Sequence, residues 1–126
     1  MRVLIIDDSR AIRAIIKRTL GELGIAECVE AGNGKEALEQ LAAKGPFQLA
    51  MVDWNMPVMN GHDFVKAARA TVTSEAMKIV MCTTETEIEQ VTKALEAGAD
   101  EYVMKPFTKD AIQSKLEMLG LIGGNA

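Results

Sequence analysis

The stretch Arg2-Val3-Leu4-Ile5-Ile6-Asp7-Asp8 is an apolar run that ends in two acids, and Leu49-Ala50-Met51-Val52-Asp53 has the same form. Continuous apolar runs of this length are typical of strands that helices cover on both faces. Carboxylates at the tips of such strands repel one another, by roughly 4 kcal/mol for two charges about 4 Å apart at an effective dielectric of about 20. We therefore expect a cation beside Asp7, Asp8 and Asp53, and such a cluster of oxygen ligands suits Mg²⁺.

Apolar runs of this kind recur along the chain and alternate with helical patterns. Strands are predicted at 3–6, 27–31, 49–52, 78–82 and 102–104. Helices are predicted between Ser9 and Gly24 and at about 35–43, 62–70, 85–97 and 109–119. This alternation predicts an α/β fold with a five-stranded parallel sheet, right-handed crossovers and helices on both faces, a doubly wound (βα)5 arrangement. In such a sheet the working site lies at the carboxyl ends of the strands.

Apolar residues at helical spacing indicate which side chains of the helices face the core. Ser9 and Thr108 are suitable N-caps for the first and last helices. In the first helix, the basic side chains are expected on the solvent side, namely Arg10, Arg13, Lys17 and Arg18. The residues expected to face inward are Ile12, Ile15, Ile16, Thr19, Leu20, Leu23, Ile88, Val91, Leu95, Ile112, Leu116 and Leu119.

The composition is that of one globular domain. The chain has 126 residues, 48% of them hydrophobic, and its net charge of −4 argues against binding to nucleic acid or to a membrane surface. Cys28 and Cys82 lie in apolar runs without metal-ligand spacing, so we expect buried thiols in a cytoplasmic protein. One domain is expected over 1–121, followed by a flexible tail at 122–126.

Several reactive side chains follow the predicted strands at their carboxyl ends. They are Asp7, Asp8, Asp53, Thr83 and Lys105. Three carboxylates, one ammonium group and one Mg²⁺ sum to zero charge, which suits phosphoryl transfer because that reaction depends mainly on positioning and charge neutralisation. Asp53 is the best candidate for the nucleophile, since it stands alone on its strand whereas Asp7 and Asp8 are adjacent and can share a metal.

Four motifs stand in order along the chain. They are Asp7-Asp8, Asp53-Trp54-Asn55-Met56-Pro57 with Asn60-Gly61 beyond it, Thr83 thirty residues after Asp53, and Lys105-Pro106-Phe107 twenty-two residues after Thr83. Together they resemble the receiver domain of two-component response regulators, and the stand-alone, chemotaxis-type receivers most closely. The resemblance covers roughly 1–119. It implies a flavodoxin-like fold with strand order 2-1-3-4-5 and a cis bond between Lys105 and Pro106.

The resemblance implies that Asp53 accepts a phosphoryl group from a histidine kinase or a phosphotransfer protein. It further implies that Asp8, Asp53 and the backbone carbonyl of Asn55 bind Mg²⁺ directly, and that Asp7 acts through a metal-bound water. The protein would then be a monomeric, single-domain phosphoacceptor that catalyses its own phosphoryl uptake and hydrolysis, rather than an enzyme with a separate substrate.

A switching mechanism is also implied by the resemblance. Lys105 pairs with Asp53 and then with the phosphoryl group, Thr83 moves its hydroxyl onto a phosphoryl oxygen, and Tyr102 turns inward. The surface of the fourth helix (about 85–97), the fifth strand and the fifth helix then changes its binding of an unidentified downstream protein. The opposing interpretation of Tyr102 is a strand residue that never moves.

Asn55 and Glu85 lie two residues beyond Asp53 and Thr83. In receivers these positions look out over the phosphoryl group, so the resemblance implies that Asn55 and Glu85 tune its hydrolysis. The alternative is that both side chains are solvated and have no effect.

Three other functions match parts of the pattern. A phosphate shuttle or sink without its own output would need the same residues as a switch. An aspartyl-phosphate hydrolase needs a second acid two residues after its nucleophile, where this chain has Asn55. A flavin carrier needs a Ser/Thr/Gly-rich loop after the first strand, where this chain has Asp7-Asp8-Ser9-Arg10.

Overall fold

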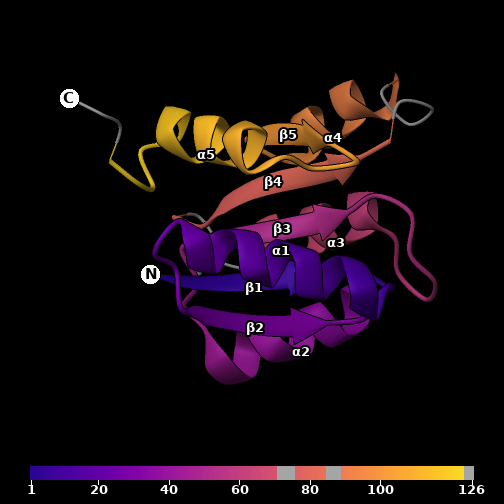
Figure 1. Ribbon diagram of the computed structural model, residues 1–126. Coiled ribbons are helices and arrows are strands. Elements are labelled where there is room, and N and C mark those ends of the chain that lie inside the picture. Colours follow the sequence, from indigo (N-terminus) through magenta and orange to yellow (C-terminus); the bar gives the residue numbers. More distant parts are fainter. Residues whose placement is uncertain (71–75, 85–88, 124–126) are drawn as a thin grey trace.

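The computed structural model describes residues 1–70, 76–84 and 89–123. Its parallel sheet has five strands in the order β2-β1-β3-β4-β5 (Figure 1). The strands are β1 Arg2–Ile6, β2 Glu27–Ala31, β3 Leu49–Asp53, β4 Lys78–Thr83 and β5 Glu101–Met104. The predicted fold and strand order are confirmed, and every predicted strand agrees with the observed one to within one residue at each end.

Helices cover both faces of this sheet (Figure 1). Helices α1 and α5 lie on one face, where Ile16, Leu20, Ile112 and Leu116 form a core with Val3, Ile5, Leu49 and Met51. Helices α2, α3 and α4 lie on the other face, where Ala37, Phe64 and Ala94 pack on Leu4, Ile6, Ala50 and Val52. The helices are α1 Arg10–Glu22, α2 Gly34–Lys44, α3 Gly61–Arg69, α4 Val91–Ala97 and α5 Lys109–Met118.

The register of the strands places the ends of β1 and β3 side by side. Ile6 pairs with Val52, so the acids that follow these two residues leave the sheet at the same edge. Asp53 in turn pairs with Cys82, which puts Thr83 one residue further along β4. Because all five strands run parallel, the residues after β1, β3, β4 and β5 meet at one edge of the sheet.

The predicted helix caps agree with the structure, but two of the residues that were predicted to be buried are exposed. Ser9 and Thr108 accept hydrogen bonds from the backbone N–H groups of Ile12 and Ala111, as expected of N-caps. Ile15 and Leu95, predicted to face inward, are 39% and 44% exposed.

Ile15 lies at the exposed border of the apolar stripe of α1, whose buried residues are Ile16, Thr19 and Leu20. In α4, Ala94 is the buried residue and Leu95, one position further along the helix, points partly into solvent. The predicted helix over about 85–97 is observed from Val91, while Glu85 and Ile88 lie outside the described residues.

Both thiols are free, with Cys82 buried in the sheet and Cys28 partly buried. Leu121 and Ile122 pack against the core on the α1 and α5 side. Within the described ranges, none of the helices has the length and the apolar composition that crossing a membrane requires.

Candidate functional site

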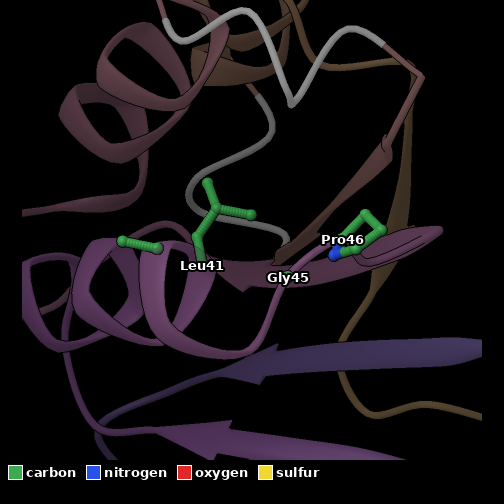
Figure 2. Close-up of a pocket in the computed structure, with 4 residues that line it drawn as sticks. Leu41, Gly45 and Pro46 are labelled. Carbon is green, nitrogen blue, oxygen red and sulfur yellow. The ribbon is translucent and has the colours of Figure 1, made fainter.

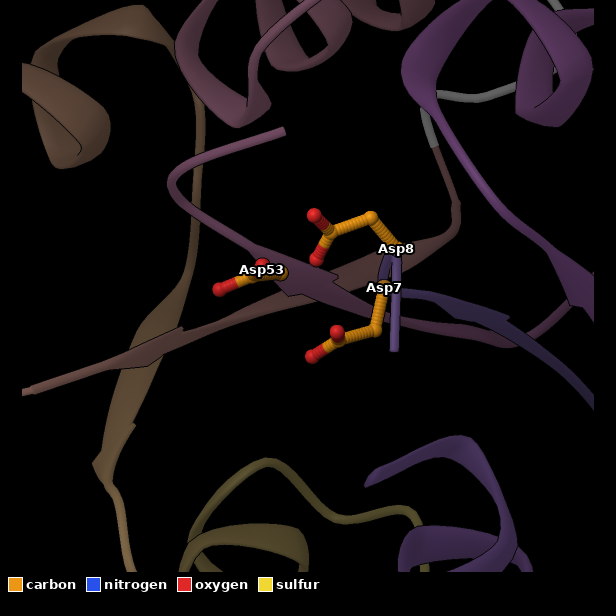
Figure 3. A group of neighbouring side chains, drawn as sticks. All are labelled: Asp7, Asp8 and Asp53. Carbon is orange, nitrogen blue, oxygen red and sulfur yellow. The ribbon is translucent and has the colours of Figure 1, made fainter. Parts of the chain in front are cut away.

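Three carboxylates meet where β1 and β3 end (Figure 3). One oxygen from each of Asp7, Asp8 and Asp53 lies within 4.8 Å of the others. Asp7 and Asp53 are only 1% and 5% exposed, whereas Asp8 is exposed to solvent. The structure therefore brings together the three acids that the sequence predicted, with one of them open to water.

Lys105 supplies the cation of this cluster from the loop after β5. Its Nζ lies 2.8 Å from Oδ1 of Asp53 and 3.1 Å from Oδ2 of Asp7. The backbone N–H of Lys105 donates to the carbonyl oxygen of Thr83 at 2.7 Å, which ties the start of the loop to the end of β4. The peptide bond between Lys105 and Pro106 is cis, as predicted.

Burial and charge set the protonation of Asp53 and Lys105. Burial raises the pKa of Asp53 to about 6, the hydrogen bond from Lys105 lowers it, and the charges of Asp7 and Asp8 raise it. Burial lowers the pKa of Lys105, but the hydrogen bond to Asp53 and its charge outweigh burial and leave the pKa above its usual value. At neutral pH the pair is therefore a carboxylate and an ammonium group.

Asp7 is held at every polar atom. Its N–H donates to the carbonyl oxygen of Ala31 at 3.1 Å, and its carbonyl oxygen accepts from Nη1 of Arg13 at 2.6 Å. Its Oδ1 accepts from the N–H of Ser9 at 2.9 Å. The carboxylate of Asp8, by contrast, has no hydrogen-bond partner among the described residues. Asp8 is thus the acid with both oxygens free for a ligand.

The loop after β3 folds tightly against Asp53. The N–H of Gly61 donates to the carbonyl oxygen of Trp54 at 2.9 Å, and a Cβ at Gly61 would lie 2.4 Å from the carbonyl oxygen of Asp53. Val58 has a φ of 68° and is 78% exposed. Asn55 is exposed beside Asp53. Gly61 belongs to the quoted motif, but the reason for a glycine there appears only in the structure.

Thr83 and Tyr102 lie on the two strands that continue the sheet beyond β3. Thr83 is 2% exposed, and its Oγ1 donates to the carbonyl oxygen of Thr84 at 3.2 Å. Tyr102 is partly buried, and Nζ of Lys115 lies 4.6 Å from the centre of its ring. Lys115 also pairs with Glu101 at 3.0 Å. Glu85 lies outside the described residues.

Comparison with known proteins agrees with this geometry. The family model of the response regulator receiver domain matches residues 3–117. The chain belongs to the response regulator receiver domains. It is 44% identical to the chemotaxis protein CheY1 of Helicobacter pylori over 94% of this chain and 96% of that protein, and 39% identical to CheY of Pseudomonas aeruginosa over 94% and 95%.

Comparison with solved structures points to the same family as the sequence comparisons. The structure of the chemotaxis response regulator CheY4 of Vibrio cholerae matches with a TM-score of 0.84 and 37% identity, over 94% of this chain and 97% of that one. This protein is thus a CheY-like receiver domain of the chemotaxis type.

The donor set of the receiver domain fits Mg²⁺. All three side chains that converge are carboxylates, and Mg²⁺ prefers oxygen ligands and keeps several waters, which the exposed side of Asp8 allows. The family and the acidic group together support a magnesium site.

A pocket elsewhere in the receiver domain does not involve these residues. It lies at the end of α2 and is lined by Leu41, Ala42, Gly45 and Pro46 (Figure 2). Because this pocket precedes β3 in the chain, it lies near the amino ends of the strands, away from the three acids.

Sequence reasoning missed two basic residues of the receiver domain. Arg13 was predicted on the solvent side of α1, yet its side chain is only 15% exposed and contacts Asp7 and Glu30. The position of a cation in the first turn of a helix, against the helix dipole, could not have singled it out, because Arg10 also lies in that turn and is exposed. No signal in the sequence marks Lys115 either.

Proposed function

We propose that this receiver domain accepts a phosphoryl group on Asp53 from the phosphohistidine of a kinase or a phosphotransfer protein, in a reaction that depends on Mg²⁺. The observation that carries the proposal is the placement of Asp53, which is bonded to Lys105 on one side and lies beside Asp7 and Asp8 on the other. Only Oδ1 of Asp53 accepts a hydrogen bond from Lys105, which leaves Oδ2 available as the nucleophile.

In the transfer step, the carboxylate oxygen forms a bond to phosphorus while the bond from phosphorus to the donor nitrogen breaks, and that nitrogen keeps the electron pair. In hydrolysis, water attacks phosphorus while the bond from phosphorus to the Asp53 oxygen breaks. Inorganic phosphate leaves, and Asp53 keeps the electron pair as a carboxylate. The chain thus catalyses its own phosphoryl uptake and loss and has no other substrate. Lys105 holds its charge beside the acceptor throughout, which offsets the negative charge that builds up.

For the metal, we assign direct ligation to Asp8, Asp53 and the backbone carbonyl of Asn55, and contact through water to Asp7. Bound Mg²⁺ would neutralise the carboxylates and the incoming phosphoryl oxygens. The free carboxylate of Asp8 supports its role as a direct ligand, whereas the hydrogen bonds from Ser9 and Lys105 to Asp7 support a water-mediated role for that residue.

A conformational response would follow from the added charge. A phosphoryl group brings about −1.5 to −2 charge and three acceptor oxygens. Thr83 would exchange its weak bond to Thr84 for a phosphoryl oxygen, and Tyr102 would move toward the space that Thr83 leaves. The surface of α4, β5 and α5 would then change its affinity for a downstream protein, by the difference in its affinity for the two states.

The first experiment uses acetyl phosphate as the phosphodonor. With Mg²⁺ present, intact mass should show one added phosphate and Trp54 fluorescence should change, because Trp54 directly follows the acceptor. Asp53→Asn should show neither effect. A wild-type protein that gains no phosphate, or an Asp53→Asn protein that still gains it, would contradict the proposal.

The lifetime of the phosphoryl group tests Asn55 and Glu85. We propose that both side chains tune hydrolysis, as implied for a chemotaxis-type receiver. The dephosphorylation rate of the wild type should differ from that of Asn55→Ala and Glu85→Ala. Unchanged rates in both variants would reject this assignment.

Affinity capture with phosphorylated and unmodified protein separates a switch from a phosphate shuttle or sink. A switch should retain a partner only in the phosphorylated state, and it should do so as a monomer. Capture that does not depend on phosphorylation would favour the shuttle. The two free thiols support a reducing, cytoplasmic setting for this exchange.

A further inference from the structure

We propose that Arg13, anchored by Glu30, is a positioning residue that fixes the peptide between Asp7 and Asp8 and thereby the direction of the Asp8 carboxylate. This inference rests on the proposed role of Asp8 in holding Mg²⁺. It assigns a role in metal affinity to a salt bridge between α1 and β2 that touches neither the metal nor the phosphoryl group.

The first observation is the contact of Arg13 with the main chain. Its Nη1 donates to the carbonyl oxygen of Asp7 at 2.6 Å. That oxygen belongs to the peptide group that contains the N atom of Asp8, and a peptide group is planar. Holding the oxygen therefore sets the plane from which the Cα of Asp8 continues. Figure 3 shows the side chains of Asp7 and Asp8 leaving the chain in different directions, with Asp53 near both.

The second observation is that Asp8 has no other support. Its carboxylate makes no hydrogen bond with any residue that the structure describes, and it is exposed. Asp7 and Asp53 are buried and bonded to Lys105, so their positions do not depend on Arg13 alone. Of the three acids, Asp8 is thus the one whose direction depends most on its main chain.

The third observation is the anchor on the neighbouring strand. Nε of Arg13 donates to Oε1 of Glu30 at 3.0 Å, and the Arg13 side chain is 15% exposed. Glu30 lies on β2, opposite Ile5 of β1. The guanidinium group uses two different N–H groups for the two contacts, which a lysine ammonium on a flexible stem cannot reproduce with the same geometry.

The cost of Arg13 supports a specific role. The first turn of α1 has no acidic residue, and Arg13 brings a cation close to the positive end of the helix dipole. A cation here also repels Mg²⁺. Arg10 stands even nearer to the start of α1, but it is exposed to solvent. The main-chain oxygen and the carboxylate that hold Arg13 in one place, rather than its charge alone, therefore support a geometric role.

Because the charge of Arg13 repels Mg²⁺, the direction of the change in Mg²⁺ affinity on replacing Arg13 tests the proposal. With Mg²⁺ alone as the probe, calorimetric titration of Arg13→Lys should give a Kd about tenfold higher than that of the wild type. Lysine keeps the positive charge but cannot make both guanidinium contacts at once. Arg13→Met should also bind more weakly, although it removes a repelling charge. Lys17→Met is the matched control, since Lys17 pairs with Glu30 at 3.9 Å without contacting Asp7, and its Kd should stay within about twofold.

A second pair of variants tests the anchor. Glu30→Ala should weaken Mg²⁺ binding in the wild-type background and have no further effect in Arg13→Met, because Glu30 acts through Arg13. The rate of phosphorylation by acetyl phosphate, measured against Mg²⁺ concentration, should reach half its maximum at about tenfold more Mg²⁺ in Arg13→Lys than in the wild type. Metal-free melting curves establish that each variant is folded before it is titrated.

The outcomes separate this inference from the proposed function. An unchanged Kd in Arg13→Lys, a tighter Kd in Arg13→Met, or a slower phosphorylation rate with unchanged Kd would each overturn the positioning role and leave the metal site intact. A wild-type protein that does not bind Mg²⁺, or binds it as well after Asp8→Asn, would instead overturn the metal site and the positioning role with it.

Discussion

Nζ of Lys105 lies 2.8 Å from Oδ1 of Asp53, although the two residues are 52 positions apart in the chain. Lys105 is the only cation that contacts the buried carboxylates of Asp7 and Asp53 within the ranges that the structure describes. Without a metal, this one ammonium group offsets the two buried negative charges, and the exposed carboxylate of Asp8 lies close to them. The stability of the metal-free protein should therefore depend strongly on Lys105 and on the protonation of Asp53.

Lys105→Met should destabilise the metal-free protein by about 3 kcal/mol at neutral pH, because it leaves buried carboxylates without a partner. The loss should shrink toward about pH 5, where Asp53 becomes protonated. Urea denaturation at both pH values measures the effect. Lys115→Met is the control, because its partner Glu101 and the Tyr102 ring lie at a partly exposed position, so the loss should be about 1 kcal/mol. Equal losses in the two variants would contradict the argument.

The stability of the metal-free wild type should fall as pH rises through the range between about 4 and about 6. Burial raises the pKa of Asp53 from 3.8 to about 6, so the folded state binds more protons than the unfolded state in this range. Stability then decreases with pH by up to about 3 kcal/mol in total and levels off above the folded pKa. Asp53→Asn should lack this contribution. The difference between the two denaturation curves isolates it, and a difference that does not change with pH would count against the shifted pKa.

Asp8→Asn should stabilise the metal-free protein by roughly 0.5–1 kcal/mol, since it removes a charge that repels Asp7 and Asp53 in an exposed position. The same variant should lose the rise in melting temperature that Mg²⁺ gives the wild type, which corresponds to about 2.7 kcal/mol at a hundred times Kd. Asp110→Asn changes the net charge equally at an exposed position in α5 and should keep the response to Mg²⁺. A destabilised Asp8→Asn protein in the absence of metal would contradict the assumed repulsion.

Val58→Asn should raise the free energy of unfolding by about 1 kcal/mol. A β-branched residue at a φ of 68° is strained, asparagine tolerates this region far better, and the exposed valine loses little buried surface on replacement. Val58→Ala should gain less, since alanine relieves the branching at Cβ but lacks the local hydrogen bonds by which an asparagine side chain stabilises this conformation. Urea denaturation of the three proteins should place alanine between valine and asparagine, and a destabilised asparagine variant would show that the valine side chain makes a contact of its own.

Gly61→Ala should destabilise the protein by about 2 kcal/mol or more and slow phosphorylation, because the added Cβ meets the backbone of Asp53 and Trp54 and moves the acceptor. Gly21→Ala is the matched control. Gly21 lies on an exposed part of α1 with nothing within 4 Å of an added Cβ, so its replacement should stabilise the helix by about 1 kcal/mol. Thermal unfolding and acetyl phosphate labelling of both variants test the contrast. Wild-type phosphorylation in Gly61→Ala would mean that the loop can shift without disturbing Asp53.

The sequence alone predicted correctly those features that depend only on neighbouring residues. Ser9 and Thr108 cap their helices because a hydroxyl followed by an apolar stripe is a nearest-neighbour signal. The helical patterns predicted the buried face less reliably, since Ile15 and Leu95 share the helical period of their neighbours but are exposed. Periodicity measures the angle of a side chain around its helix, whereas burial depends on how far the sheet extends beneath it.

Asp7, Asp8, Asp53, Thr83 and Lys105 could be gathered from the chain alone, because parallel strands bring their carboxyl ends to one edge whatever the details of packing. The pairing of Lys105 with two of those acids, the raised pKa of Asp53, the close approach of Gly61 and the grip of Arg13 on the Asp7 carbonyl depended on the folded molecule. Hydrogen bonds and desolvation act over a few ångströms, and only the packing of distant segments determines which groups come that close.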